Sequence, residues 1–353
     1  ARKFGFDDNR YLFNRGHWKQ LEDTPAGPRV KARNAKGVET YEVSGADEKS
    51  FTTDFLAAKT VDFIQANKDR PFCFMVSLPD PHGPNTVRPP YDTMYAKMAF
   101  KLPASAEGQG RMENMARYFG MVKCIDDNVG KILEGLDKAG VLDKTMVVFT
   151  ADHGDMCGEH ALVNKGVPFD ASARVPFIIA YPAKIRPGTV IREALSTVDF
   201  KPTVLGLLGL PADGSDEGRD ASELLLTGKP PAGWKDAVFS RNAAGIWLMA
   251  VSARYKFIVF PNDDPCLYDL DADPFETRNL CREPAMRETV RGLARSLSDY
   301  AVRCKEPFAE TPAIRADLDW AAGAGAGYQA PARPVPAAKA KKNGKRREAG
   351  EDE

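Results

Sequence analysis

The 353-residue sequence has no net charge, because 49 basic residues balance 49 acidic residues. It therefore lacks the basic excess that proteins use to bind nucleic acid or anionic membranes. It also lacks any apolar run long enough to cross a bilayer. We predict no nucleic-acid partner and no membrane span.

The cysteines form no C-x-x-C pair, which argues against a zinc ribbon or a thioredoxin-type redox site. There are six of them: Cys73, Cys124, Cys157, Cys266, Cys281 and Cys304. Disulfides and buried thiols both fit this number in a chain of this length. Cysteine usage therefore leaves the cellular compartment open.

The chain also lacks an initiator methionine and a signal-peptide pattern, and it opens with Ala1-Arg2-Lys3-Phe4. We expect this start to be a cut within a longer protein. Residues 1–49 are polar and are expected to form an irregular surface loop with aromatic anchors.

The pattern of apolar residues predicts alternating helices and strands up to about residue 234. Helices are expected at 56–67 with Ser50 as N-cap, at 115–136 and at 200–210, and strands at 72–78, 145–150 and 175–181. The strands are short and continuously apolar, as in strands buried on both faces. We therefore predict an α/β domain, residues 1–234, with a mostly parallel sheet flanked by helices.

The pattern changes after residue 235. Short strands are expected at 247–251, 255–260 and 266–270, followed by a helix at 284–302. These elements predict a smaller antiparallel α+β subdomain over residues 235–305. Residues 306–353 are expected to be an extended to disordered tail, since the end of the chain is rich in Ala, Gly, Pro and Lys.

Histidine is rare in this chain, and its positions are informative. Three of the four histidines, His82, His153 and His160, lie in the loops at 79–84 and 151–165. Each loop follows an expected strand, and ligand sites of α/β sheets form beyond the carboxyl ends of strands. Because histidine transfers protons near neutral pH, this clustering favours a catalytic rim over chance.

The expected strand at 145–150 runs directly into Ala151 and then Asp152-His153-Gly154-Asp155. A carboxylate held at a sheet edge suits a metal ligand. The alternative is that Asp152 or Asp155 caps a helical turn.

The sequence around this motif resembles the type I sulfatases of the alkaline-phosphatase superfamily. The resemblance rests on residues 72–84, 118–140, 143–182, 197–203, 218–220 and 267–280. It implies an alkaline-phosphatase-like fold and hydrolysis of sulfuric esters.

The resemblance also implies a role for each matching residue. Asp152 and His153 match the second pair of ligands of a divalent metal, which is usually Ca²⁺. Imidazole suits Mn²⁺ or Zn²⁺ better than Ca²⁺, so the ion stays open. Lys165 matches the lysine that binds the sulfate, and His82 matches the histidine that protonates the leaving oxygen.

Three further residues are candidates for the pocket. His160 could face the substrate, and His17 and Trp18 could line the pocket from the amino-terminal loop.

The family nucleophile is absent from this sequence. It is a formylglycine made from Cys or Ser in a C/S-x-P-S-R motif, and no such motif occurs. We expect the formylglycine, the first strands of the sheet and the other metal ligands to lie in a missing amino-terminal part. The chain alone should then be inactive, and its exposed apolar edges should make it aggregate.

The leading hypothesis is a fragment of a sulfatase that acts on a sulfated carbohydrate or a small organic sulfate. The alternatives are a phosphonate monoester or phosphodiester hydrolase of the same superfamily and a non-catalytic relative. The resemblance also implies a periplasmic or extracellular location, and the oligomeric state stays open.

Overall fold

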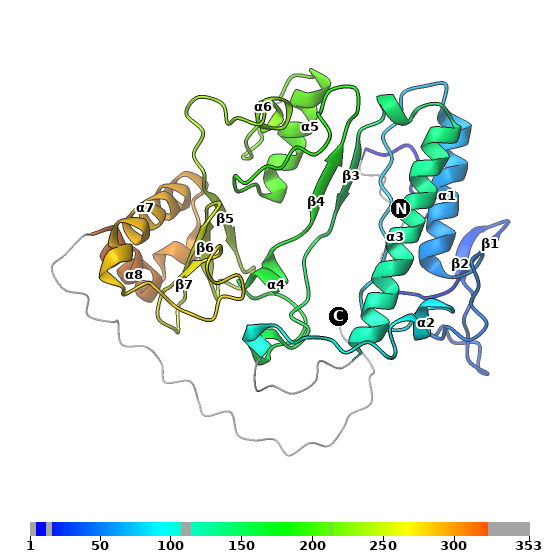
Figure 1. Cartoon of the computed structure of the whole chain (residues 1–353), viewed down its shortest axis with the longest axis horizontal. Helices are drawn as coiled ribbons and strands as arrows, with labels where there is room; N and C mark the ends of the chain where they lie inside the picture. The colour runs from blue at the N-terminus through cyan, green and yellow to red at the C-terminus, as the bar shows by residue number, and fades with distance from the viewer. Residues whose placement is uncertain (1–4, 12–15, 107–113, 213, 324–353) are drawn as a thin grey trace, which may run out of the picture. The chain divides into compact units, whose positions relative to one another are not determined.

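The computed structural model describes residues 5–11, 16–106, 114–212 and 214–323 (Figure 1). The chain folds as two compact units. The first comprises Ala1–Asp152, Met156–Val163 and Val175–Thr189, and the second comprises His153–Asp155, Asn164–Arg174 and Val190–Glu353.

The first unit is built on two long helices, α1 (Thr52–Asn67) and α3 (Met115–Lys138), which lie side by side (Figure 1). Shorter elements are α2 (Tyr91–Met94) and the 3-10 helices η1 (Ala104–Ala106), η2 (Leu142–Lys144) and η3 (Glu159–Ala161). Both long helices lie where their apolar spacing predicts them. The N-cap of α1 is Phe51 rather than Ser50, and the Ser50 hydroxyl accepts from the Asp47 amide and donates to the Asp47 carboxylate instead.

A buried ion pair joins α1 to α3 and to the loop before α2. Arg88 donates to both carboxylate oxygens of Asp54, at 2.7 and 2.8 Å, and Asn128 donates to the same carboxylate at 3.0 Å. Burial would raise the pKa of Asp54, but the hydrogen bonds from Arg88 and Asn128 outweigh it and the pKa is lowered. The carboxylate therefore stays charged and fixes the two helices to each other.

The first unit also contains a hairpin within the segment expected to be irregular. Strands β1 (Leu21–Thr24) and β2 (Gly27–Val30) pair antiparallel, with Leu21 opposite Val30. Leu21 and Val30 are buried against the start of α1, so tertiary packing stabilises a hairpin that has little apolar sequence of its own.

Two expected strands form and pair, but in the opposite sense to the prediction. β3 (Val147–Thr150) and β4 (Phe177–Ala180) are antiparallel, and so is every other strand pair of the described residues. The predicted parallel pairing is therefore wrong for this part of the chain.

The third expected strand of this unit, residues 72–78, is not a strand, and this prediction is also wrong. Phe74 and Met75 are 40% and 65% exposed. A strand that is apolar on both faces needs hydrogen-bonding neighbours and packing layers, and the described residues do not place them around this segment. Ile178 of β4 is likewise 62% exposed. The β3–β4 sheet therefore exposes apolar side chains, as expected from the sequence.

The second unit contains a four-stranded antiparallel sheet in the order β5-β6-β7-β8. The strands are β5 (Val238–Arg241), β6 (Leu248–Val251), β7 (Tyr255–Val259) and β8 (Cys266–Asp269). The last three lie where the alternation predicts them. The helices are α4 (Asp170–Ala173), α5 (Phe200–Leu208), α6 (Ser222–Thr227), α7 (Arg287–Cys304) and α8 (Pro312–Ala322), with 3-10 helices η4 (Thr197–Asp199), η5 (Pro284–Met286) and η6 (Pro307–Glu310).

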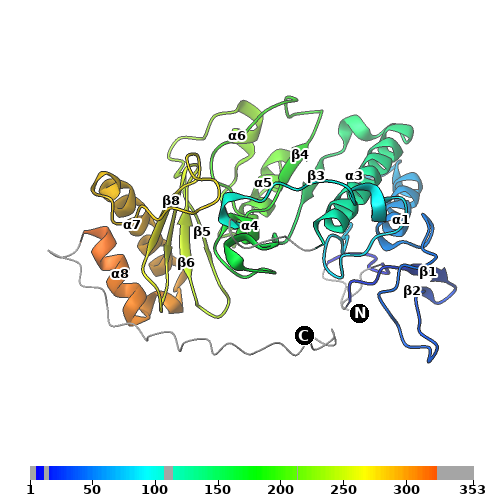
Figure 2. The ribbon, with the colours of Figure 1, turned by 60° about the horizontal axis from the view of Figure 1, so that its bottom comes forward.

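One face of this sheet packs against α7 and α8 (Figure 2). Leu248, Ala250 and Phe257 point into this core and are at most 1% exposed. Helix α8 lies in the segment predicted to be a tail. That prediction is wrong as far as Ala322, because α8 buries an apolar stripe that includes Ile314 and Leu318. Residues 324–353 of the expected tail lie outside the described residues.

The other face of the sheet carries the alternate residues, as the two-residue period of a strand requires. Trp247, Met249 and Ile258 form this second cluster, and Phe169 and Ala173, beside and within α4, pack against it. The sheet therefore has α7 and α8 on one face and the segment around α4 on the other. None of the helices in the described ranges is long and apolar enough to cross a membrane.

Candidate functional site

His82 lies in an exposed loop of the first unit. Two contacts orient its imidazole ring. Its Nδ1 lies 2.8 Å from the carbonyl oxygen of Gly83. Its ring stacks on that of His17, with ring centroids 3.5 Å apart and an interplanar angle of 19°. The two histidines, 65 positions apart in the sequence, therefore share one place in the fold.

A buried lysine holds the His82 loop through hydrogen bonds. Lys19 is fully buried, and its Nζ donates to Asp80 at 2.6 Å and to the carbonyl oxygen of His82 at 3.1 Å. The hydroxyl of Thr53, at the start of α1, donates to the other oxygen of Asp80 at 2.6 Å. Because a buried charge without a partner is costly, this arrangement fixes the backbone on both sides of Pro81.

Asp152 and His153 follow β3 after a single residue, Ala151. The chain then makes a close approach that only glycine permits. A Cβ on Gly154 would lie 2.1 Å from the carbonyl oxygen of Ala171, and the Gly154 amide donates to the carbonyl of Ser172 at 2.8 Å. The backbone after His153 is therefore fixed against α4.

The His153 ring is oriented by its own loop. Its Nδ1 lies 2.7 Å from the carbonyl oxygen of Gly154. If Nδ1 carries the proton, the lone pair is on Nε2, which is the arrangement that metal-binding histidines commonly have. The environment of His153 is thus compatible with a metal ligand.

The loop that carries His160 holds an unusual density of left-handed backbone. Four residues other than glycine have positive φ within eight positions: Cys157, His160, Ala161 and Asn164. Such conformations persist where surrounding contacts over-determine them, and they concentrate at functional sites. One such contact is the hydroxyl of Ser105, which donates to Glu159 at 2.6 Å.

Lys165 is exposed on a loop of the second unit, and its neighbour Gly166 is held by three hydrogen bonds. The Gly166 carbonyl accepts from Trp247 Nε1 and from Asn242 Nδ2, both at 2.9 Å. The Gly166 amide donates to Ser172 Oγ at 3.0 Å. Gly166 has φ +90°, a conformation that favours glycine.

A second buried lysine supports the far end of the Lys165 loop. Lys256, 1% exposed, donates to the Pro168 carbonyl at 3.0 Å, to Glu276 at 2.7 Å and to Asp170. Glu276 also accepts from the Asp170 amide at 2.6 Å. Burial raises the pKa of Glu276, and the charge of Lys256 opposes that rise.

The seven candidate residues predicted from sequence are divided between the units. His153 and Lys165 belong to the second unit, and the other five, His17, Trp18, His82, Asp152 and His160, belong to the first. Apart from His17 and Trp18, each stands on a loop that follows a strand or that a buried cluster fixes.

The supporting residues Lys19, Lys256, Trp247 and Asn242 were missed by sequence reasoning. One of them left a trace in the sequence. Lys256 interrupts the apolar strand Tyr255–Val259, and a lysine within such a strand needs buried partners. The sequence could not identify those partners, because Asp170 lies 86 positions away.

Asp152 and His153 offer a carboxylate and an imidazole, which are both ordinary ligands of divalent metals. Within the part of the chain that the structure describes, no three His, Cys, Asp or Glu side chains converge as a metal site would require. These two residues therefore fit a metal as a partial ligand set.

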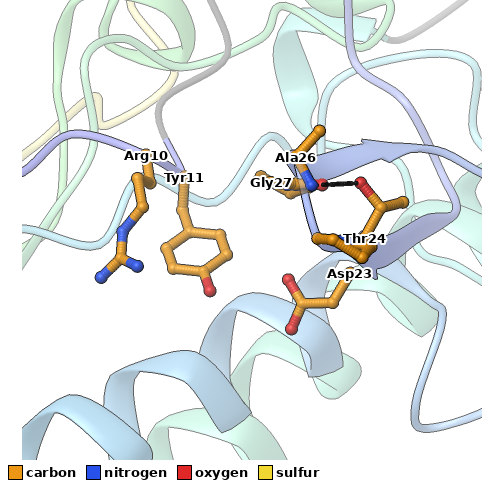
Figure 3. Close-up of a pocket in the computed structure, with 8 residues that line it drawn as sticks. Arg10, Tyr11, Asp23, Thr24, Ala26 and Gly27 are labelled. Atoms are coloured by element: carbon orange, nitrogen blue, oxygen red, sulfur yellow. Dashed lines mark hydrogen bonds between the residues drawn. The ribbon is translucent and has the colours of Figure 1, made fainter.

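A separate cavity of about 560 Å³ lies beside the β1–β2 hairpin of the first unit (Figure 3). Arg10, Tyr11 and Asp23 line it, together with the hairpin turn, in which the Thr24 hydroxyl donates to the Gly27 carbonyl at 2.7 Å. None of the predicted site residues lines this cavity.

Comparisons with solved structures establish the class of fold. BT4656, solved with its substrate D-glucosamine-2-N,6-O-disulfate, aligns with a TM-score of 0.64 at 21% identity, over 74% of this chain and 72% of that chain. The phosphonate monoester hydrolase of Agrobacterium radiobacter aligns with a TM-score of 0.61 at 26% identity, over 73% of this chain and 62% of that one. The fold is thus alkaline-phosphatase-like, as the sequence predicts.

Sequence comparisons establish the family. Residues 7–210 match the sulfatase family, and residues 158–303 match the carboxy-terminal region of the N-sulphoglucosamine sulphohydrolases. The first match covers more than half of the chain, so the chain belongs to the sulfatase family.

Curated relatives show how much of a family member's length this chain covers. The arylsulfatase of Clostridium perfringens is 28% identical over 284 residues, which are 72% of this chain and 58% of the relative. The ulvan-active sulfatase of Formosa agariphila is 30% identical over 258 residues, 69% of this chain and 50% of the relative. The chain thus spans between half and three fifths of the length of these relatives.

Proposed function

We propose that this chain supplies the leaving-group side of a sulfuric ester hydrolase site, with His82 and Lys165 as catalytic residues and Asp152 and His153 as metal ligands. The observation that carries the proposal is that all four residues stand on fixed loops within residues 7–210, the region that matches the sulfatase family. No C/S-x-P-S-R motif occurs in the sequence, so the proposal assigns no nucleophile to these 353 residues.

The chemistry assigned to Lys165 and His82 follows from where charge develops. Cleaving a sulfate ester places negative charge on the leaving oxygen and on the sulfuryl oxygens. The ammonium of Lys165 stabilises the sulfuryl charge. The imidazolium of His82 donates a proton from Nε2 to the leaving oxygen, while Nδ1 faces the Gly83 carbonyl at 2.8 Å.

Asp152 and His153 would hold a divalent cation. Such an ion, when bound, acts as a Lewis acid on the sulfuryl oxygens. The mixed oxygen and nitrogen donors accept Ca²⁺ and suit Mn²⁺ or Zn²⁺. We propose Ca²⁺ by the family resemblance. His160 is proposed to face the substrate, on the strength of its place in the loop of left-handed residues.

We propose a sulfated carbohydrate as the substrate. Several relatives are named for such substrates, including the N-acetylglucosamine-6-O-sulfatase of Bacteroides thetaiotaomicron at 30% identity over 239 residues. One further relative, in Drosophila melanogaster, is named an extracellular sulfatase homologue, which supports a periplasmic or extracellular location for this protein.

A phosphonate or phosphodiester hydrolase is the second candidate function. It is favoured by the likeness to the phosphonate monoester hydrolase of Agrobacterium radiobacter. The two candidates predict opposite preferences between an aryl sulfate and an aryl phosphate diester.

The test uses the natural gene product that carries these 353 residues, assayed on both esters. We expect preference for the sulfate, and a loss of about 10²- to 10⁴-fold in kcat/KM for Lys165→Ala. Lys144→Ala, which removes an exposed lysine after α3, is the matched control and should keep full activity. Preference for the phosphate diester would replace the first candidate with the second, and activity on neither ester would favour a non-catalytic relative.

The role of His82 has its own measurement. A general acid matters most when the leaving group is a poor one, since such an oxygen needs a proton to depart. His82→Ala should therefore reduce kcat strongly on an alkyl sulfate and only slightly on 4-nitrophenyl sulfate. Equal losses on both substrates would remove His82 from this role.

A further inference from the structure

The short loop that carries Lys165 is held by the carboxy-terminal sheet at two separate points. One point is Gly166, next to Lys165, and the other is the stretch from Pro168 to Asp170. All of the residues involved belong to the second unit, and they lie on the sheet face opposite to α7 and α8.

At the first point, both peptide units around Gly166 are fixed. The amide of Gly166 belongs to the peptide unit shared with Lys165, and it donates to Ser172 Oγ. The carbonyl of Gly166 belongs to the next peptide unit, and it accepts from Trp247 and Asn242. Because the peptide unit is planar, fixing two successive units fixes the conformation of Gly166 and the position of the Lys165 Cα atom, which belongs to the first of these units.

Trp247 and Asn242 are themselves rigidly placed. Trp247 is 5% exposed and packs in the cluster with Met249 and Ile258, so its ring cannot turn away from Gly166. A buried indole N–H requires an acceptor, and the Gly166 carbonyl supplies it. The Oδ1 of Asn242 accepts from the Ala244 amide at 2.8 Å, which leaves the Nδ2 group directed at Gly166.

At the second point, Lys256 closes the loop with a buried ion cluster. Its ammonium binds the Pro168 carbonyl and the carboxylates of Asp170 and Glu276. The loop from Lys165 to Asp170 is thus restrained at its beginning and at its end.

We propose that Trp247 and Asn242 are positioning residues for Lys165. By clamping the Gly166 carbonyl they restrain the backbone next to Lys165, so that its ammonium is held close to the sulfuryl group. What Lys165 does in catalysis rests on the proposed function, whereas the clamp itself is a property of this chain. Displacement of a catalytic group by about 1 Å can cost about 10²-fold in rate, so such a clamp has functional weight.

The test measures the order of the loop in the full 353-residue chain. Trypsin cleaves after Lys165, which is exposed, and cleavage requires the loop to open. Trp247→Phe keeps the aromatic bulk but removes the N–H donor. Asn242→Asp keeps the acceptor for Ala244 but replaces the donor to Gly166 with a carboxylate oxygen.

The double variant should be cleaved after Lys165 about tenfold faster than the original chain, as expected for the loss of two neutral hydrogen bonds. Asn242→Asp alone should give about threefold and covers the case in which Trp247→Phe does not fold. Met249→Leu, a volume-conserving change in the same cluster, is the control and should leave this rate unchanged. A rate within twofold of the original, or an equal increase at all tryptic sites, would overturn the clamp.

A second readout separates the clamp from the proposed function. In the natural gene product, Trp247→Phe should raise KM for an aryl sulfate and lower kcat, with the melting temperature within a few degrees of the original. Faster cleavage without any sulfate hydrolysis would sink the proposed function and leave the clamp standing. Sulfate hydrolysis with unchanged cleavage and unchanged KM would sink the clamp alone.

Discussion

The His82 loop of the first unit and the Lys165 loop of the second unit are supported by the same kind of arrangement. In each, a fully buried lysine donates to a carboxylate and to a backbone carbonyl of the loop: Lys19 to Asp80 and His82, and Lys256 to Glu276 and Pro168. Two predicted catalytic residues thus have a common means of support.

The two supports differ in their balance of charge. Lys19 faces one carboxylate, and the neutral hydroxyl of Thr53 satisfies its second oxygen. Lys256 faces the two carboxylates of Asp170 and Glu276, and the pKa of Glu276 is raised by burial. The first support is therefore a matched buried pair. In the second, the other cation is the exposed Arg174, which pairs with Asp170 at 3.5 Å, so Lys256 is the one buried cation beside two carboxylates.

The largest expected effect breaks the matched pair. Lys19→Met leaves the Asp80 carboxylate buried without its cation, which should lower the free energy of unfolding by about 3–5 kcal/mol. Urea titration of the full chain measures this loss. Lys19→Met combined with Asp80→Leu is the control, and it should recover most of the stability because no charge remains buried. A single-variant loss under about 1 kcal/mol would contradict the account.

The same change in the second unit should have a smaller effect. Lys256→Met leaves two carboxylates, but Glu276 can take up a proton, so we expect a loss of about 3 kcal/mol near neutral pH. Since protonation relieves the buried charge, the loss should shrink as the pH is lowered, and urea titrations at several pH values measure it. A loss that is independent of pH would show that Glu276 does not relieve it.

The sign of the pH dependence sharpens the comparison further. The raised pKa of Glu276 means that the folded state binds the proton more tightly than the unfolded state. Through this group the protein therefore becomes less stable as the pH rises above 4.5, the ordinary pKa of a glutamate. Asp54 of the first unit, with a lowered pKa, contributes stability that is lost as the pH falls. Each pKa unit corresponds to about 1.4 kcal/mol.

Substituting each carboxylate separates these two contributions. Glu276→Gln should remove the loss of stability that accompanies rising pH. Asp54→Asn should remove part of the loss of stability that accompanies falling pH. Thermal melting across about pH 3 to 8 measures both. If both variants changed the slope of melting temperature against pH in the same way, the opposite contributions of Glu276 and Asp54 would be contradicted.

The smallest expected effect on stability concerns one sheet of each unit. Ile178 of the two-stranded β3–β4 sheet is 62% exposed, whereas Ile258 of the four-stranded sheet is fully buried. Ile178→Lys should change the free energy of unfolding by less than about 0.5 kcal/mol, yet it should reduce the aggregation that we expect of the isolated chain. Light scattering during storage measures this, and Ile258→Lys is the destabilising counterpart. A monodisperse original chain would contradict the expected aggregation.

The sequence predicted the helices better than the sheets. The apolar spacing of α1, α3 and α7 is a local property, so the helices could be predicted. The strand expected at residues 72–78 could not be judged locally, since a strand forms only where partners lie beside it. Helix α8 was missed because the composition of the following residues suggested a tail, although Ile314 and Leu318 form an apolar stripe.

The sequence by itself determined the family. It also singled out His82, Asp152, His153 and Lys165, which stand in locally recognisable motifs, as the residues that we propose for its chemistry. Only the tertiary structure showed what holds them, because Lys19 and His82 are 63 positions apart and Trp247 and Gly166 are 81 apart. The physical reason is that a buried donor is satisfied by whichever acceptor the fold brings near, and sequence distance does not limit that choice.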